Sequence, residues 1–386
     1  MKKWFEKKGR QILEKLLECL FAVKRPTLPV SEFIKYLDCP RILVVRIDQR
    51  VGNLLLLTPL LDAIKFQWPQ AQISVLCQYQ VASVLMYQPS IDKIIKFDKK
   101  SFFSSYGWGC VFYKLRQTRF DIAINAGNPL GDTFTHPFVT RFCGARYLVG
   151  PHKVKPDQVK YPTWLYHAAV WIEPHWHEMH KRLALIAPLL GLVEHELIDK
   201  QIKTPQTPCY ANAATLQQLT IQHQSLILQI NKQCQQLRTV VVIIGARLEN
   251  KRLNIEDWRD ICELLKERRF SIVVVFGPKE VVLAQALFAQ CPFVVLAPPT
   301  SLEECAALMY QAFAVIGCDT GLSHLAVAVN KRVLVIFLDT DPQFYGYQTQ
   351  FQRFIDARHK SQRTSTIKQA INSFFDGSPE SLDLVR

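Results

Sequence analysis

The first half of the chain alternates short apolar runs with amphipathic segments. The apolar runs have strand length and are rich in Val, Ile and Leu, at 41–47, 72–77, 93–97, 120–127 and 145–150. The amphipathic segments carry apolar residues at helical spacing, at 54–67, 132–143 and 177–192. Strands that alternate with helices form parallel sheets covered by helices on both faces. This half therefore predicts an α/β domain.

The same alternation begins again at residue 239. The predicted strands are continuous apolar runs, at 239–246, 270–277, 293–298, 313–318 and 332–338. The predicted helices between them lie at 255–269, 280–290, 302–312 and 321–330. Two such Rossmann-like domains facing each other would hold ligands at the carboxyl ends of their strands, in the cleft between them.

Two domains are also what a length of 386 residues favours. A polar stretch rich in Gln, Pro and Thr separates the two series. We therefore divide the chain into a basic N-terminal helix, an N-terminal domain, a linker, a C-terminal domain and a tail with a candidate helix, at 1–29, 30–198, 199–237, 238–350 and 351–386.

Residues 1–25 have the pattern of a basic amphipathic helix. The apolar positions recur at helical spacing, at Phe5, Ile12, Leu13, Leu16, Leu17, Leu20 and Phe21. The other face carries lysines and an arginine, and three glutamates interrupt what would otherwise be a signal-peptide core. Such a helix either lies in the interface of an anionic membrane or packs on the domain with a solvated basic face.

Charge and composition limit the expected partners and cellular compartment of the protein. The net charge of +14 favours anionic partners, but no nucleic-acid-binding motif accompanies it, so nucleic acid is not an expected partner. The eleven cysteines form no C-x-x-C pair, so no zinc or redox motif is present. An odd number of cysteines without a pattern fits a reducing cytoplasm. No apolar stretch reaches the roughly 18 residues of a membrane span. We therefore expect a cytoplasmic protein.

Residues 317–342 contain a candidate anion site. A predicted strand ends at Cys318, Asp319-Thr320-Gly321 forms the turn, and a helix opens with Ser323 and His324 in its first turn. Free backbone N–H groups and the helix dipole converge there, and Gly321 has no side chain to obstruct a diphosphate. The alternative is an ordinary capped helix with His324 on the surface.

Two further loops follow strands and carry chemistry. GARLENKRL places Gly245, Arg247 and Lys251 after a strand, either to meet the same phosphates or as a solvated basic turn. RIDQRVGN places Asp48 close to another strand end, together with Arg46, Arg50, Gly52 and Asn53. Asp48 is a candidate base, a helix-entry cap or the ion-pair partner of Arg46 or Arg50.

Histidines cluster at 167–180, and such a cluster raises the question of a metal site. His177 and His180 lie three residues apart, but no third ligand follows at a clear spacing and Pro174 breaks the run. We predict no metal site, and an aromatic surface near the acceptor or between domains fits this stretch better.

The order of these three loops resembles glycosyltransferase family nine, the ADP-heptose–lipopolysaccharide heptosyltransferases. The motifs that carry the resemblance are RIDQRVGNLLLLTPLL, GARLENKRLNIEDW and DTGLSHL followed by DTDP, and the match extends over roughly 40–350. HEMHKRLALIAPLLG is also similar to the helix that closes the family's N-terminal domain.

The resemblance implies a GT-B fold and an inverting, metal-independent transfer with no cofactor. The C-terminal half would bind a nucleotide-diphosphate-sugar such as an ADP-sugar. The N-terminal half would bind an inner-core lipopolysaccharide acceptor at the cytoplasmic face of the inner membrane, with Arg46, Arg50 and Gly52 near it. The implied donor contacts are Gly245, Arg247, Lys251, Thr300, Asp319, Thr320, Gly321, Ser323 and His324.

One departure from the family pattern concerns the catalytic base. The family has Asp after the loop glycine, whereas this chain has Asn53, and an amide does not accept a proton at neutral pH. Either Asp48 replaces that base, or the chain is a weak or silent homologue that binds sugar-nucleotide or lipopolysaccharide. Leu253 also stands where the family usually has Trp.

Overall fold

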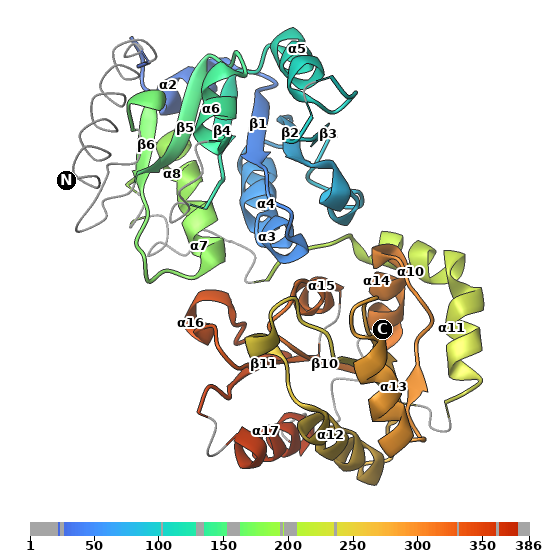
Figure 1. The fold of residues 1–386 in the computed structure, drawn as a ribbon. Helices are drawn as coiled ribbons and strands as arrows, with labels where there is room; N and C mark the ends of the chain where they lie inside the picture. Colours follow the sequence, from blue (N-terminus) through green and yellow to red (C-terminus); the bar gives the residue numbers. More distant parts are fainter. Residues whose placement is uncertain are drawn as a thin grey trace, which may run out of the picture. The chain divides into compact units, whose positions relative to one another are not determined.

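A computed structural model gives the fold (Figure 1), and it describes residues 22–23, 27–101, 103–128, 135–152, 163–193, 196, 207–234, 238–329, 332–359 and 363–376. The chain divides into two compact units. The first comprises 1–49 and 57–205, and the second comprises 50–56 and 206–386. The amphipathic helix predicted at 1–25 falls almost entirely outside the described residues.

The first unit is built on a six-stranded parallel sheet of order β3-β2-β1-β4-β5-β6. Its strands are β1 (Arg41–Arg46), β2 (Gln72–Gln78), β3 (Lys93–Phe97), β4 (Ile122–Asn125), β5 (Tyr147–His152) and β6 (Ala168–Trp171). Its helices are α2 (Val30–Phe33), α4 (Thr58–Gln67), α5 (Trp108–Thr118), α6 (Thr135–Phe142), α7 (Glu178–Leu183) and α8 (Ala187–Leu190). Residues 42–45 of β1 are fully buried, as a central strand with helices on both faces requires.

The second unit repeats this plan, with the sheet order β12-β11-β10-β7-β8-β9. Its strands are β7 (Thr239–Ile243), β8 (Ser271–Val275), β9 (Val295–Leu296), β10 (Ala314–Cys318), β11 (Val333–Phe337) and β12 (Gln352–Asp356). Its helices are α3 (Val51–Leu55), α10 (Ala213–Gln222), α11 (Gln224–Asn231), α12 (Ile255–Glu267), α13 (Val281–Gln290), α14 (Leu302–Gln311), α15 (Gly321–Val329), α16 (Pro342–Tyr345) and α17 (Arg363–Asp376). The predicted α/β class with two parallel sheets is confirmed.

Several predicted boundaries need correction. The helix predicted at 54–67 is two helices, because Pro59 starts α4 and cannot continue α3. Pro188 likewise starts α8 within the helix predicted at 177–192. Much of the predicted linker 199–237 belongs to the second unit, where α10 buries Leu216 and Leu219. The predicted tail from 351 also belongs to the second unit, since it supplies the edge strand β12 and the helix α17.

Candidate functional site

The strand order reverses once in each sheet, and the loops at those points carry the residues singled out above. In the second sheet β10 and β7 are neighbours, with their following strands on opposite sides. The carboxyl ends of two such strands open a crevice, which is the usual ligand position in α/β sheets. The loop after β7 carries Lys251, and the turn after β10 carries Asp319.

Lys251 and Asp319 form an ion pair between the loops that follow these two strands. Lys251 Nζ lies 2.5 Å from Asp319 Oδ2, and the two side chains are 22% and 8% exposed. Lys251 stands in a 3-10 turn, η5 (Glu249–Lys251), and the Asp319 N–H donates to the Ile336 carbonyl in β11. The structure thus brings together two residues that lie 68 positions apart in the sequence.

The first turn of α15 follows directly. Ser323 Oγ donates to the Cys318 carbonyl at 2.5 Å, and the Ser323 N–H donates to Thr320 Oγ1 at 3.4 Å. These bonds are those of a capped helix, which was the alternative interpretation of this turn. Thr320 remains partly exposed beside the ion pair.

His324 is buried and does not lie on the surface. Its Nε2 lies 3.8 Å from Asp319 Oδ1, and its Nδ1 lies 2.6 Å from the hydroxyl of Tyr347. Burial lowers the pKa of His324, so the imidazole is neutral at pH 7. Burial also raises the pKa of Tyr347, which keeps its phenol protonated. Tyr347 belongs to no sequence motif, so its contact with His324 could not be predicted.

Two glycines allow α3 to lie against α15 within the second unit. A Cβ added at Gly52 would stand 2.5 Å from His324 Cδ2, which is closer than atoms can approach. A Cβ added at Gly321 would stand 3.2 Å from Val51 Cβ and 3.4 Å from the Gly52 nitrogen. The side of Gly321 that lacks a side chain is therefore occupied by α3. The prediction that it leaves room for a diphosphate is not supported at this position. Asn53 is half-buried in the same short helix.

The remaining predicted donor residues occupy neighbouring loops of the second unit. Arg252 pairs with Glu280 at 2.8 Å, and Gly245 lies against the same carboxylate, so this part of the loop is fixed internally. Arg247 is exposed. Thr300 lies before α14, with its Oγ1 3.1 Å from Cys305 Sγ.

In the first sheet the strand order reverses between β1 and β4. Arg46, at the end of β1, is 1% exposed and pairs with Asp48 at 2.8 Å. Arg46 Nη1 also donates to the Ala126 carbonyl, which follows β4. The sequence left three roles open for Asp48. The ion pair between Arg46 and Asp48 shows that one of them, pairing with Arg46, is present. Arg50 is exposed and precedes α3 in the other unit.

A second buried charge cluster lies on α7. Glu178 binds Lys181 at 2.9 Å and Arg182 at 2.6 Å, and all three side chains are at least 94% buried. Burial raises the pKa of Glu178, but the charges of Arg182, Lys181 and Arg46 outweigh it and hold the pKa below its usual value. The helix itself was predicted within 177–192, but the charge cluster was not, although E-x-x-K-R places all three charges within about one turn of helix.

His136 on α6 holds the loop that carries Asp48. The Ile47 N–H donates to His136 Nε2 at 2.8 Å. Burial, followed by the charge of Arg46, lowers the pKa of His136 to about 3. The imidazole is therefore neutral at pH 7 and accepts the hydrogen bond that positions the backbone next to Asp48.

We expect His136 to make stability depend on pH. Its pKa is about 3 in the folded chain and 6.5 in the unfolded one, so its contribution is complete above pH 6.5 and is lost as the pH falls toward 3. Between pH 7 and pH 5 the wild type should lose about 2 kcal/mol more than His136→Gln, which cannot take up the proton. Urea unfolding at the two pH values measures this difference, and equal losses would contradict it.

The described residues contain no group of three or more His, Cys, Asp or Glu placed to hold a metal ion. His177 instead caps α7, because its Nδ1 accepts from the Met179 N–H. None of the described helices combines the length and apolar character that a membrane span requires.

Comparison with known proteins gives consistent matches. The family model "Glycosyltransferase family 9 (heptosyltransferase)" matches residues 109–372. Lipopolysaccharide heptosyltransferase 3 of Escherichia coli is 24% identical over 308 residues, which cover 76% of this chain and 82% of that protein. Lipopolysaccharide heptosyltransferase 1 of Escherichia coli K12 is 34% identical over 92 residues, 24% of this chain. That match spans only 29% of heptosyltransferase 1.

Two solved structures share the fold. The E. coli heptosyltransferase WaaC with ADP has a TM-score of 0.64 at 21% identity, covering 88% of this chain and 99% of that one. E. coli ADP-heptose lipopolysaccharide heptosyltransferase II has a TM-score of 0.66 at 18% identity, covering 87% and 99%. These likenesses confirm the GT-B type of fold.

Proposed function

Because the chain belongs to glycosyltransferase family 9, the heptosyltransferase family, we propose that it transfers a heptose-like sugar from an ADP-sugar to a lipopolysaccharide core acceptor. The observation that carries the proposal is the pairing of Lys251 with Asp319 beside the first turn of α15, at the point where the second sheet reverses. A cation beside the N-terminus of a helix suits a nucleotide diphosphate.

The transfer we propose is inverting and metal-independent. An acceptor hydroxyl attacks the anomeric carbon of the donor sugar and loses its proton to a base, while the bond to the diphosphate breaks. Lys251 and the N-terminal turn of α15 stabilise the negative charge that develops on the leaving diphosphate. Asp48 is the proposed base, and Arg46 and His136 hold its loop.

Asp319 has a different role in this proposal. Its carboxylate lies between Lys251 Nζ and His324 Nε2, so it orients the lysine and contacts no phosphate itself. Thr320 opens the first turn of α15, and Ser323 holds that turn through its bonds to Thr320 and to the Cys318 carbonyl. Arg247 and Thr300 lie in adjoining loops and would meet the nucleotide. His324, neutral and bonded to Tyr347, is proposed to contact the donor from the same turn.

A silent homologue is the second candidate function, and Asn53 is the observation that favours it. A nucleotide-release assay separates the two. Purified protein is mixed with ADP-, UDP- and GDP-sugars and extracted lipopolysaccharide core. ADP release that requires both partners supports the transferase. Binding of ADP-sugar without release under any acceptor condition would support the silent homologue.

We propose that the protein works at the inner face of the inner membrane, since its acceptor is a glycolipid. Deleting residues 1–25 should lower binding to vesicles that contain anionic lipid and leave the fold intact, because this segment precedes β1. Vesicle sedimentation measures the binding, and thermal unfolding checks the fold. Equal binding by both forms, or loss of folded protein, would favour a helix packed on the domain.

A further inference from the structure

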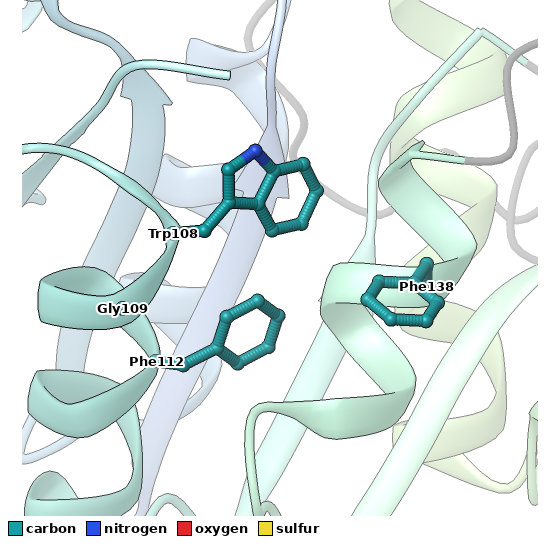
Figure 2. A pocket seen from close by; sticks show the side chains of 4 residues that line it. All are labelled: Trp108, Gly109, Phe112 and Phe138. Carbon is teal, nitrogen blue, oxygen red and sulfur yellow. The ribbon is translucent and has the colours of Figure 1, made fainter. Parts of the chain in front are cut away.

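The first unit carries an aromatic hollow that the proposed transfer does not use. Trp108, Gly109 and Phe112 on α5 and Phe138 on α6 line a depression of about 540 Å³ (Figure 2). The ring centroids of Trp108 and Phe112 are 5.7 Å apart and their planes nearly parallel. Phe138 meets both rings edge-on, at 6.1 and 6.2 Å.

The hollow presents almost only carbon. The indole N–H of Trp108 is bonded to the Lys99 carbonyl, so the polar atom of that ring is already satisfied. Trp108 and Phe112 also pack partly on the core of the first unit, which fixes their orientation. A small polar ligand needs convergent polar groups to orient it, and the lining residues supply none.

The loop before α5 adds a further exposed ring. Phe103 is 94% exposed, and Tyr106 and Phe138 are each 38% exposed. Backbone bonds hold the loop, from Asp98 N–H to the Tyr106 carbonyl and from Gly107 N–H to the Ser104 carbonyl. This exposed ring adds to the apolar surface of the segment that leads into α5.

The charged side chains of both helices and of the loop before α5 are mostly basic, with Asp98 the acidic residue that directly precedes this loop. Residues 99–119 contain Lys99, Lys100, Lys114, Arg116 and Arg119 and no Asp or Glu, and all five are exposed. Residues 135–146 contain Arg141 and Arg146, again without an acidic residue. Aromatic rings surrounded by basic side chains match an anionic bilayer, where rings enter the interface and cations meet lipid phosphates.

We propose that this surface, made of the α5–α6 hollow, Phe103 and their basic flanks, docks the protein on an anionic phospholipid bilayer. The inference rests on the proposed function only in that a glycolipid acceptor gives the protein a reason to be at a membrane. It places membrane contact on the first unit itself, independently of residues 1–25.

The first test uses full-length protein and sedimentation with vesicles of phosphatidylglycerol and phosphatidylethanolamine. Lys100→Glu with Lys114→Glu should weaken binding at least about tenfold, because each cation near such a surface contributes measurably to affinity. Lys232→Glu with Lys279→Glu has the same charge change on exposed sites of the second unit and is the matched control. Equal weakening by both pairs would overturn the proposal, since net charge would then explain it.

A second pair tests the rings. Phe103→Ser with Phe138→Ser should also weaken binding several-fold, whereas Tyr36→Ser with Phe66→Ser, which removes rings 76% and 62% exposed elsewhere on this unit, should not. Thermal unfolding confirms that each variant is folded. If the Phe103/Phe138 pair changes the oligomeric mass and leaves vesicle binding intact, the surface is a protein interface and the proposal fails.

Quenching by brominated phosphatidylglycerol locates the contact without disturbing it. Trp108→Phe should remove much of the quenching, and Trp4→Phe reports separately on the N-terminal segment. Quenching that disappears only with Trp4→Phe would overturn the proposal. No donor or acceptor is present in these assays, so failure of the transferase proposal is detected separately, by absent nucleotide release.

Discussion

Asp48→Asn should reduce turnover by about 10²–10⁴-fold while leaving ADP-sugar affinity nearly unchanged, if Asp48 is the base. The substitution preserves volume and keeps an oxygen that accepts from Arg46, so the buried guanidinium retains a hydrogen-bond partner. Steady-state rates with lipopolysaccharide core acceptor give kcat, and calorimetry gives donor affinity. Thermal unfolding shows whether loss of the Arg46 ion pair affects the fold.

Asn53→Asp is the companion variant. If Asp48 is the base, this variant should do little or should impair the enzyme. If the base is simply missing, Asp48→Asn should be mild and Asn53→Asp should raise a low activity. Wild-type rates in both variants of an active enzyme would contradict both accounts and require a base from another loop.

Lys251→Ala should weaken donor binding or turnover by about tenfold or more, because a charge-assisted contact to phosphate contributes roughly 1.5–3 kcal/mol. The loss should exceed that of a simple contact, since Asp319 is left as an unpaired carboxylate near an anionic donor. Calorimetric titration with ADP measures it. Lys279→Ala, at an exposed lysine of the same unit, is the control.

A double variant separates two roles of Lys251. If the lysine only neutralises Asp319, Lys251→Ala with Asp319→Asn should recover most of the ADP affinity. If Lys251 binds the diphosphate directly, the double variant should stay weak. Unchanged affinity in the single variant would remove Lys251 from the donor site.

Sequence periodicity predicted most of the sheet strands, because a buried parallel strand is apolar on both faces and leaves a continuous run. It missed β6 and β12 at the sheet edges. β6 is only four residues long and half-buried, and β12 mixes polar and apolar residues. It missed α5 as well, whose aromatic and basic composition hides its two fully buried positions, Val111 and Leu115.

The candidate site divides in the same way. The sequence by itself determined the loops, since Asp-Thr-Gly and the basic turn stand directly after strands and strand order brings strand ends together. Only the tertiary structure decided the partners. It paired Lys251 with Asp319, Arg46 with Asp48, and His324 with Tyr347. Two of these pairs join distant segments, and in the Arg46–Asp48 pair the structure chose among alternatives that the sequence had left open. All three depend on side-chain direction and burial, which local spacing does not encode.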